Sequence, residues 1–444
     1  MFIKMNRLSL ALIIIILYGL VSCNNADKSN ETIASFGKTD ACKSDSKNTY
    51  EVYIPERQSA VEKLPLLIII DAHGSGKFAI DKFKHGAERY PVILVASNLI
   101  KNGHSNYEGA IQALIKDVCQ KYPVGETIFI SGFSGGARMA LGYALNHLLD
   151  GLILCGALAE ADRINALRST VISISGMDDF NFIETAQYLF QEQSIPGNLK
   201  IELINASHNW PDSLVLTNAL GFLLLSSQST DISSLTKSQF TAFCENQLAR
   251  IDSLKKKGEF LEAASVARNM AFTEPFNNNK NFAVKYKSLI NDPEYKNRLN
   301  QLKSCLTFEM NAQQTYINAF MTENVPWWRN EIKTIDGKIR TEQDPYTIDM
   351  YRRIKAFWGI ACYSLSNQAV KEQKVKMLNK ILPVYRMLEP DNPDMLYFSA
   401  FPFYWNGKNE AALSILKKAR QAGFSDISRL KKDFSETITS KLGP

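Results

Sequence analysis

The residue best placed to do chemistry is Ser134, at the centre of the run G-F-S-G-G at positions 132–136. The apolar run Thr127 to Ile130 precedes it and predicts a buried strand, and helix-forming residues follow it. A sharp turn between strand and helix leaves little space beside its central residue, so glycines are needed two positions before and two positions after it. Such a turn would expose the Ser134 hydroxyl beyond the end of a sheet, which suits a nucleophile.

This strand, turn and helix around G-x-S-x-G resembles the nucleophile elbow of the α/β-hydrolases, in particular the small serine esterases and dienelactone-hydrolase-like proteins. The resemblance spans roughly Thr49 to Leu225. It implies an α/β fold with a mostly parallel sheet. It also implies a catalytic acid and then a histidine, both following the serine in the chain.

The histidine that the resemblance requires is His208, in a loop after the predicted strand Leu199 to Asn205. The other four histidines precede the elbow or lie in the helix that follows it, and a structural surface role for His208 is the alternative. The acid should follow the predicted strand Thr170 to Ser175, where a Gly-x-x-Asp pattern favours Asp179. Adjacent residues of an extended segment face opposite ways, so Asp178 stays open as the alternative.

These residue types suit acyl transfer. His208 would take the proton of Ser134, which is a poor nucleophile when neutral, and later return it to the leaving group. Asp179 would hold the imidazole in the required tautomer. By the same resemblance, the backbone amides of Ser75, in the segment D-A-H-G-S-G, and Gly135 would form the oxyanion hole. A glycine-rich turn without a catalytic role is the alternative interpretation of that segment. The proposed chemistry requires no metal or organic cofactor.

The elements that must position these residues alternate between strand and helix patterns. Apolar runs at 66–70, 92–96, 127–130, 151–158, 170–175 and 199–205 predict strands covered on both faces, with an earlier strand at 49–54. Helical spacing at 107–122, 138–149 and 212–225 separates some of them, which predicts a parallel sheet with right-handed crossovers. The connection 159–169 is too short for a lid insertion, so we expect an open cleft that accepts a bulky or polymer-linked ester.

The N-terminus has the pattern of an export signal. Lys4 and Arg7 precede an apolar run from Leu8 to Tyr18, and Leu-Val-Ser-Cys at 20–23 resembles the lipobox of bacterial lipoproteins. That resemblance implies acylation of Cys23 and anchoring at the bacterial cell envelope, on the periplasmic or surface side. An ordinary signal peptide or a signal anchor is the alternative. The net charge of +6 is modest, and the absence of a basic-aromatic patch argues against nucleic acid as a partner.

With 444 residues, the chain is too long for one ordinary core. We expect a signal peptide at 1–22, a flexible tether at 23–45, a hydrolase domain at 46–230 and an all-α domain at 235–444. Within the last part, 258–275 and 396–419 resemble tetratricopeptide-type helix pairs. The aromatic clusters at 327–328 and 401–405 fit helix packing or a surface for a ligand or protein partner. Six cysteines follow Cys23, and neither zinc spacing nor a deducible disulfide pairing is evident.

The sequence therefore predicts an exported, lipid-anchored serine hydrolase, most simply a carboxylic ester hydrolase. A peptidase or lactone hydrolase with the same triad is one alternative. A non-catalytic lipoprotein that recruits a partner through its helices is the other, because a fold does not dictate chemistry.

Overall fold

The computed structural model describes residues 35–56, 63–190, 195–227 and 237–442. The predicted signal peptide at 1–22 and the predicted lipidation site Cys23 lie outside these residues, so both stay predictions. Of the helices in the described ranges, none combines the length and apolar character needed to cross a bilayer.

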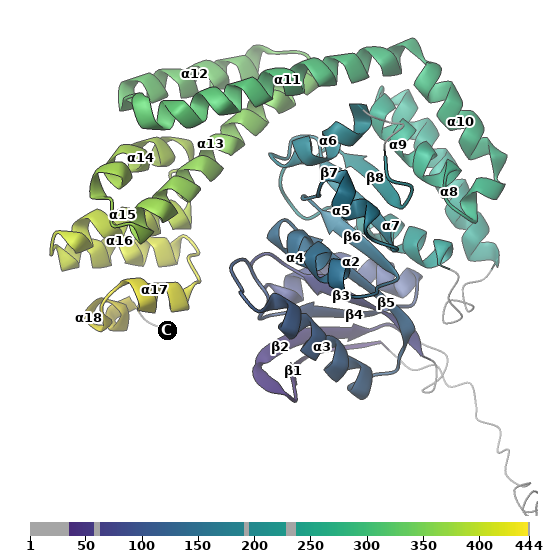
Figure 1. Ribbon diagram of the computed structural model, residues 1–444, viewed down its shortest axis with the longest axis horizontal. Helices are drawn as coiled ribbons and strands as arrows, with labels where there is room; N and C mark the ends of the chain where they lie inside the picture. The colour runs from purple at the N-terminus through teal and green to yellow at the C-terminus, as the bar shows by residue number, and fades with distance from the viewer. Residues whose placement is uncertain (1–34, 57–62, 191–194, 228–236, 443–444) are drawn as a thin grey trace, which may run out of the picture.

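An eight-stranded sheet organises the N-terminal half (Figure 1). Its strands follow one another in the order β1-β2-β4-β3-β5-β6-β7-β8. The first pairings, β1 with β2 and β2 with β4, are antiparallel, and all the others are parallel. The strand bounds are β1 (Phe36–Cys42), β2 (Asp45–Ile54), β3 (Leu64–Ile70), β4 (Ile93–Ser97), β5 (Val124–Phe133), β6 (Gly151–Cys155), β7 (Thr170–Gly176) and β8 (Leu199–Ile204). This topology confirms the predicted α/β-hydrolase-like fold class.

Helices cover both faces of the sheet, which explains why the central strands are continuous apolar runs. Every residue of β3 and β4 is buried. Side chains of α2 (Gly76–Arg89) and α7 (Ser213–Ser226) pack on one face. Side chains of α3 (Tyr107–Lys121), α4 (Gly135–Asn146), α5 (Ala161–Asn165) and α6 (Phe182–Phe190) pack on the other. The β6–β7 connection holds only the five-residue α5, so there is no lid insertion at that point.

The sheet starts earlier than the sequence predicted. Strand β1 lies inside the segment 23–45 that we expected to be a tether, and it pairs antiparallel with β2 along its whole length. Its first four residues are exposed, and β1 is an edge strand of the sheet. A polar edge strand carries no apolar alternation, and this is why its sequence resembles a tether.

The C-terminal half is all helical, as predicted. Its helices are α8 (Lys237–Lys256), α9 (Phe260–Ala271), α10 (Lys280–Asn291), α11 (Pro293–Thr322), α12 (Val325–Thr341), α13 (Pro345–Lys371), α14 (Val375–Leu388), α15 (Pro393–Trp405), α16 (Asn409–Gln421), α17 (Ile427–Asp433) and α18 (Glu436–Thr439). Four of them begin with an Asp or Asn whose side chain accepts a backbone N–H of the first turn, followed by proline within two residues (Asp292, Asn324, Asp344 and Asn392). Such caps fix the helix starts, since proline is favoured where no N–H is needed.

The first helices of this half seal the open edge of the sheet. Asn269 of α9 pairs with the edge strand β8 as a further strand would: its Oδ1 accepts from Ile201 N at 3.2 Å, and its Nδ2 donates to Ile201 O at 2.6 Å. Ser265 Oγ donates to the same carbonyl. Unpaired strand edges invite aggregation, so this side-chain pairing protects β8.

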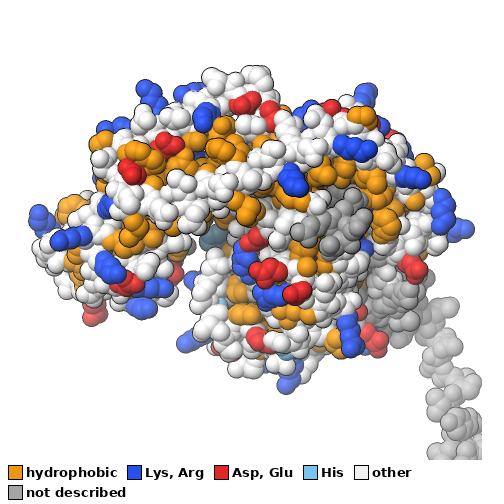
Figure 2. Space-filling model, turned by 45° about the horizontal axis from the view of Figure 1, so that its top comes forward, with side chains coloured by type: hydrophobic (Ala, Val, Ile, Leu, Met, Phe, Trp, Pro, Cys, Tyr) orange, Lys and Arg blue, Asp and Glu red, His pale blue; other side chains and the backbone are white. Residues whose placement is uncertain are grey.

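The later helices form an arc that extends from α10 across α11 and α12 and returns through α13 to α18 (Figure 1). The space-filling view shows a hollow between this returning arm and the sheet-containing half (Figure 2). The aromatic cluster at 327–328 mostly forms helix-packing core, because Trp328 is 1% exposed and packs edge-on to Trp358 at 5.6 Å. In the second cluster Phe401 is buried, whereas Phe403 is 39% exposed. The tetratricopeptide resemblance stays a prediction, and so do the domain boundaries other than the start of the sheet-containing part.

Candidate active site

The turn between β5 and α4 has the strained geometry that the sequence indicated. Ser134 has φ 54° and ψ −118°, a conformation that costs a non-glycine residue about 1–3 kcal/mol. A Cβ on Gly132 would stand 2.3 Å from the carbonyl carbon of Gly136, and a Cβ on Gly136 would stand 2.0 Å from Ile70 O. Glycine is therefore required at both positions by the neighbouring backbone. The turn is anchored to the next strand by Ser134 N, which donates to Cys155 O at 2.8 Å.

The structure brings His208 to the predicted serine. His208 lies between β8 and α7, and its Nε2 is 2.9 Å from Ser134 Oγ. Two aromatic rings flank the imidazole, Phe180 at 4.1 Å and Phe133 at 4.7 Å between ring centroids. The His208 side chain keeps 20% of its surface exposed. It is therefore shielded on its faces yet remains accessible from solvent, as a proton acceptor for a bound substrate must be.

Asp179, and not Asp178, meets the histidine. Both carboxylate oxygens of Asp179 lie 2.8 Å from His208 Nδ1, and Asn181 N donates to Oδ1 at 2.8 Å. Asp179 is 2% exposed. Gly156, with φ 64°, passes beside it, and a Cβ there would stand 3.1 Å from Asp179 Oδ2. This glycine, which the sequence analysis did not single out, leaves the space that the carboxylate occupies.

Asp178 points instead toward the helical half. Its Oδ2 lies 3.9 Å from a guanidinium nitrogen of Arg352 on α13, whose other carboxylate neighbour is Asp349 at 3.3 Å. Burial, and then the charge of Asp349, raise the pKa of Asp178 to about 6, although Arg352 and Arg353 oppose this rise. The two adjacent aspartates thus face different parts of the molecule.

The segment predicted to supply an oxyanion-hole amide is organised by Asp71, which is 3% exposed. Asp71 Oδ1 accepts from His73 N at 2.9 Å and from Ser75 N at 3.1 Å, and Oδ2 accepts from Trp210 Nε1 at 2.8 Å. The amide of Ser75 is therefore already engaged. It could serve a substrate oxygen only by sharing or releasing the bond to Asp71, so its role stays a prediction.

The second predicted donor, Gly135, is the first residue of α4. Amides of a first helical turn have no acceptor inside the helix, and they favour developing negative charge. The exposed side chain of Asn102 lies against this residue, since a Cβ on Gly135 would stand 1.7 Å from Asn102 Oδ1. The sequence analysis missed Asn102 and Asp71, because neither belongs to a local motif that names a role.

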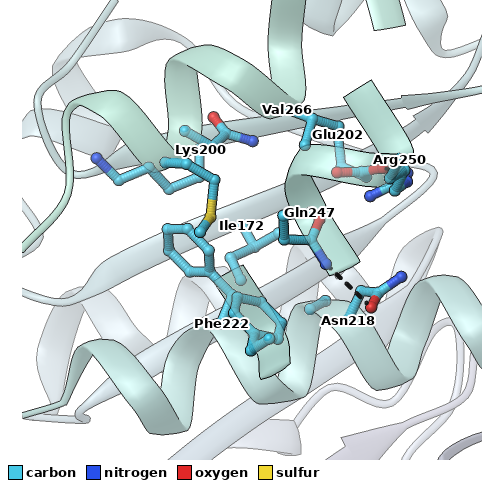
Figure 3. A pocket seen from close by; sticks show the side chains of 12 residues that line it. Ile172, Lys200, Glu202, Asn218, Phe222, Gln247, Arg250 and Val266 are labelled. Atoms are coloured by element: carbon cyan, nitrogen blue, oxygen red, sulfur yellow. Dashed lines mark hydrogen bonds and ion pairs between the residues drawn. The ribbon is translucent and has the colours of Figure 1, made fainter. Parts of the chain in front are cut away.

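A small cavity elsewhere in the molecule is too narrow for a substrate. It has a volume of about 30 Å³, room for one or two waters, and lies between the sheet and helices α7, α8 and α9 (Figure 3). Burial and the charge of Arg268 lower the pKa of Lys200, in its wall, to about 8. Its lining includes Lys200, Glu202, Asn218, Phe222, Gln247 and Arg250, and no residue of the Ser134 site.

Two other predictions concern metals and cysteines. Within the described residues, no group of three or more His, Cys, Asp or Glu side chains is arranged to hold a metal ion. The six cysteines of this part of the chain are free. Cys155 of β6 is buried, whereas Cys119 is exposed because it lies on the outer side of α3.

Comparison with known proteins finds no matching protein-family model and no matching curated protein. Solved structures that are similar to part of the chain include the following three. Est1E from Butyrivibrio proteoclasticus is 14% identical with a TM-score of 0.33, over 41% of this chain and 95% of that one. The dienelactone hydrolase-like promiscuous phosphotriesterase P91 from metagenomic libraries is 14% identical with a TM-score of 0.33, over 41% and 87%. An S-formylglutathione hydrolase from Agrobacterium tumefaciens is 12% identical with a TM-score of 0.31, over 42% and 90%.

Proposed function

We propose that this chain is a serine hydrolase that cleaves carboxylic esters. The observation that carries the proposal is the continuous hydrogen-bond chain from Ser134 Oγ through His208 to Asp179, on a turn with the strained backbone of a nucleophile elbow. The distances between these groups, and the order serine, histidine, aspartate, match what general-base activation of a serine requires.

In the proposed reaction, Ser134 Oγ attacks the ester carbonyl while His208 Nε2 accepts its proton. The buried Asp179 carboxylate stabilises the imidazolium that results. The tetrahedral intermediate collapses when His208 returns the proton to the leaving alcohol, and an acyl-serine remains. Water then attacks the acyl carbonyl and loses a proton to His208, and His208 returns this proton to Ser134 Oγ as the acid leaves. The Gly135 amide, at the α4 N-terminus, faces the developing oxyanion, and such a donor contributes about 3–4 kcal/mol to the transition state.

The surroundings of the site favour an ester on a bulky carrier. The β6–β7 connection carries no lid, and Ser134 and His208 are both partly exposed. The exposed side chain of Asn102 lies beside Gly135, the residue that follows Ser134. A substrate could therefore present a single ester group while the rest of it remains outside.

The function is tested by turnover of short-chain p-nitrophenyl esters by the purified protein. Ser134→Ala should lower kcat by about 10⁵ to 10⁶-fold. Ser131→Ala is a matched control on the same strand, because the Ser131 hydroxyl donates to Ile153 O and the residue is fully buried. It should keep most of the activity. An inactive wild type, or equal activity in both variants, would contradict the proposal and favour a non-catalytic lipoprotein. Faster turnover of peptides or lactones than of esters would favour those alternatives.

We also propose that the protein is exported and anchored at the bacterial cell envelope through Cys23. The support is the sequence pattern at 4–23. Metabolic labelling with a clickable fatty acid should mark the wild type and fail to mark Cys23→Ala. Equal labelling, or none in either, would contradict the anchor.

A further inference from the structure

One buried ion pair of the helical half contacts the loop that carries the candidate acid. Arg353 of α13 is 0% exposed, and so is Glu309 of α11. Arg353 Nε donates to Glu309 Oε2 at 2.9 Å, and Nη2 lies 2.8 Å from the same oxygen. The remaining nitrogen, Nη1, donates to the backbone carbonyl of Met177, in the other half of the chain.

Met177 lies two residues before Asp179, in the turn that follows β7. On its other side, this turn is fixed to the segment that leads to His208: Met177 N donates to Ile204 O at 2.9 Å, and Asp178 N donates to Ala206 O at 3.1 Å. The turn is therefore held between two supports. The backbone of the histidine segment is one, and the Arg353 side chain is the other.

Arg353 also contacts the chain beyond the acid. Its guanidinium carbon lies 5.2 Å from the centre of the Phe182 ring, and Phe182 N donates to Asp179 O at 2.8 Å. The same side chain thus touches the segment on both sides of Asp179. A planar guanidinium can hold a carboxylate on one edge and a carbonyl on another while it stacks on a ring, and neither lysine nor an apolar side chain can do so.

The cost of this pair indicates that its purpose is not stability alone. Two fully buried charges lose their hydration, and replacing such a pair by apolar residues of similar size is often neutral or stabilising. Packing between α11 and α13 therefore does not require charges. The Met177 carbonyl, by contrast, gains a donor from the Arg353 guanidinium, whose orientation Glu309 fixes.

We propose that Arg353, held by Glu309, is a positioning residue that keeps Asp179 in register with His208, so that the helical half completes the active site. The proposal rests on the hydrolase function proposed above. It assigns the helices a role in the reaction itself, beyond any binding of a partner.

The test compares two double variants with the full-length wild type. Arg353→Met with Glu309→Met removes both charges and the donor to Met177 while leaving no unpaired buried ion. Arg250→Met with Glu202→Met is the control, because this second arginine–glutamate pair joins α8 to β8 without contacting the acid turn. Thermal unfolding, kcat and KM on a p-nitrophenyl ester, and the pH profile of kcat/KM are measured for each.

The first double variant should unfold near the wild-type temperature, with kcat reduced about 10 to 100-fold and KM changed less than about 3-fold, since a shift of about 1 Å at a catalytic group costs about 10²-fold. The acidic limb of its kcat/KM profile should move to lower pH, because a misplaced carboxylate no longer stabilises the His208 imidazolium. The control double variant should leave both kcat and the pH profile of kcat/KM unchanged.

A folded first variant with wild-type kcat and pH profile would overturn the proposal, and so would an equal loss in the control pair. If that variant does not fold, Arg353→Lys decides. Its ammonium can pair with Glu309 but cannot also hold Met177, so a folded lysine variant with wild-type kcat would refute positioning. A wild type that neither turns over esters nor reacts with a fluorophosphonate refutes the underlying function instead, which separates the two failures.

Discussion

Replacing Asp178 by asparagine should stabilise the folded protein at neutral and alkaline pH. The carboxyl is partly buried at the contact between the acid turn and α13, and burial, then Asp349, raise its pKa from 3.8 to about 6. A raised pKa means that the folded state binds the proton more tightly than the unfolded state. The contribution of Asp178 to stability is therefore greatest below about pH 4, falls as the pH rises toward about 6, and stays reduced above that.

The size of the effect follows from the same values. A pKa change from 3.8 to about 6 corresponds to about 3 kcal/mol at most. The side chain is 18% exposed, so solvent screening leaves about 1–2 kcal/mol. Asparagine carries no charge at any pH, so it should recover this amount at pH 8 and little of it at pH 4.

Urea unfolding of wild type and Asp178→Asn at pH 4, 6 and 8 measures the difference. Asp162→Asn, at an exposed position of α5, is the control and should change the free energy of unfolding by less than about 0.5 kcal/mol at each pH. A stabilisation by Asp178→Asn that does not grow between pH 4 and pH 8, or a loss of stability at pH 8, would refute the reasoning.

Three further predictions concern the site. Asp179→Asn should lower kcat on a p-nitrophenyl ester by about 10⁴-fold, while Asp178→Asn stays within about 3-fold of wild type; equal losses would contradict the assignment of the acid. Gly136→Ala should prevent correct folding of the elbow, because its Cβ would clash with Ile70 O. Gly135→Ala should fold normally, because its Cβ would meet only the Asn102 side chain, which can rotate away. Circular dichroism and soluble yield measure the difference. Trp210→Phe should cost about 1–3 kcal/mol in urea unfolding by removing a donor to the buried Asp71, and an unchanged stability would show that this bond contributes nothing.

Much of the sheet-containing half is predictable because its signals are local. Continuous apolar runs predicted the buried strands, and glycines flanking Ser134 predicted a turn that only they can make. The short β6–β7 connection predicted the lack of a lid. Each of these features depends on a few neighbouring residues.

The parts that escaped prediction depend on contacts between distant segments. Strand β1 is recognisable only through its pairing with β2. The closure of the sheet edge by Asn269 is recognisable only through the contact of Asn269 with Ile201. The His208 loop meets Asp179, whereas Arg352 of α13 lies near Asp178. Contacts with distant segments therefore decide which aspartate is the acid. The link from Arg353 to Met177 spans 176 positions of sequence and leaves no local pattern.

The central claim is that Ser134 is a nucleophile activated by His208, and covalent trapping tests it most directly. Wild-type protein is treated with a fluorophosphonate and mapped by tandem mass spectrometry, beside His208→Gln and the control His147→Gln, whose ring stacks on Tyr143 away from the site. The adduct should be found on Ser134 in the wild type and the control, and its rate of formation should fall at least about 10²-fold in His208→Gln. A folded wild type without an adduct on Ser134 would contradict the account. So would a His208→Gln variant that forms the adduct as fast as the wild type.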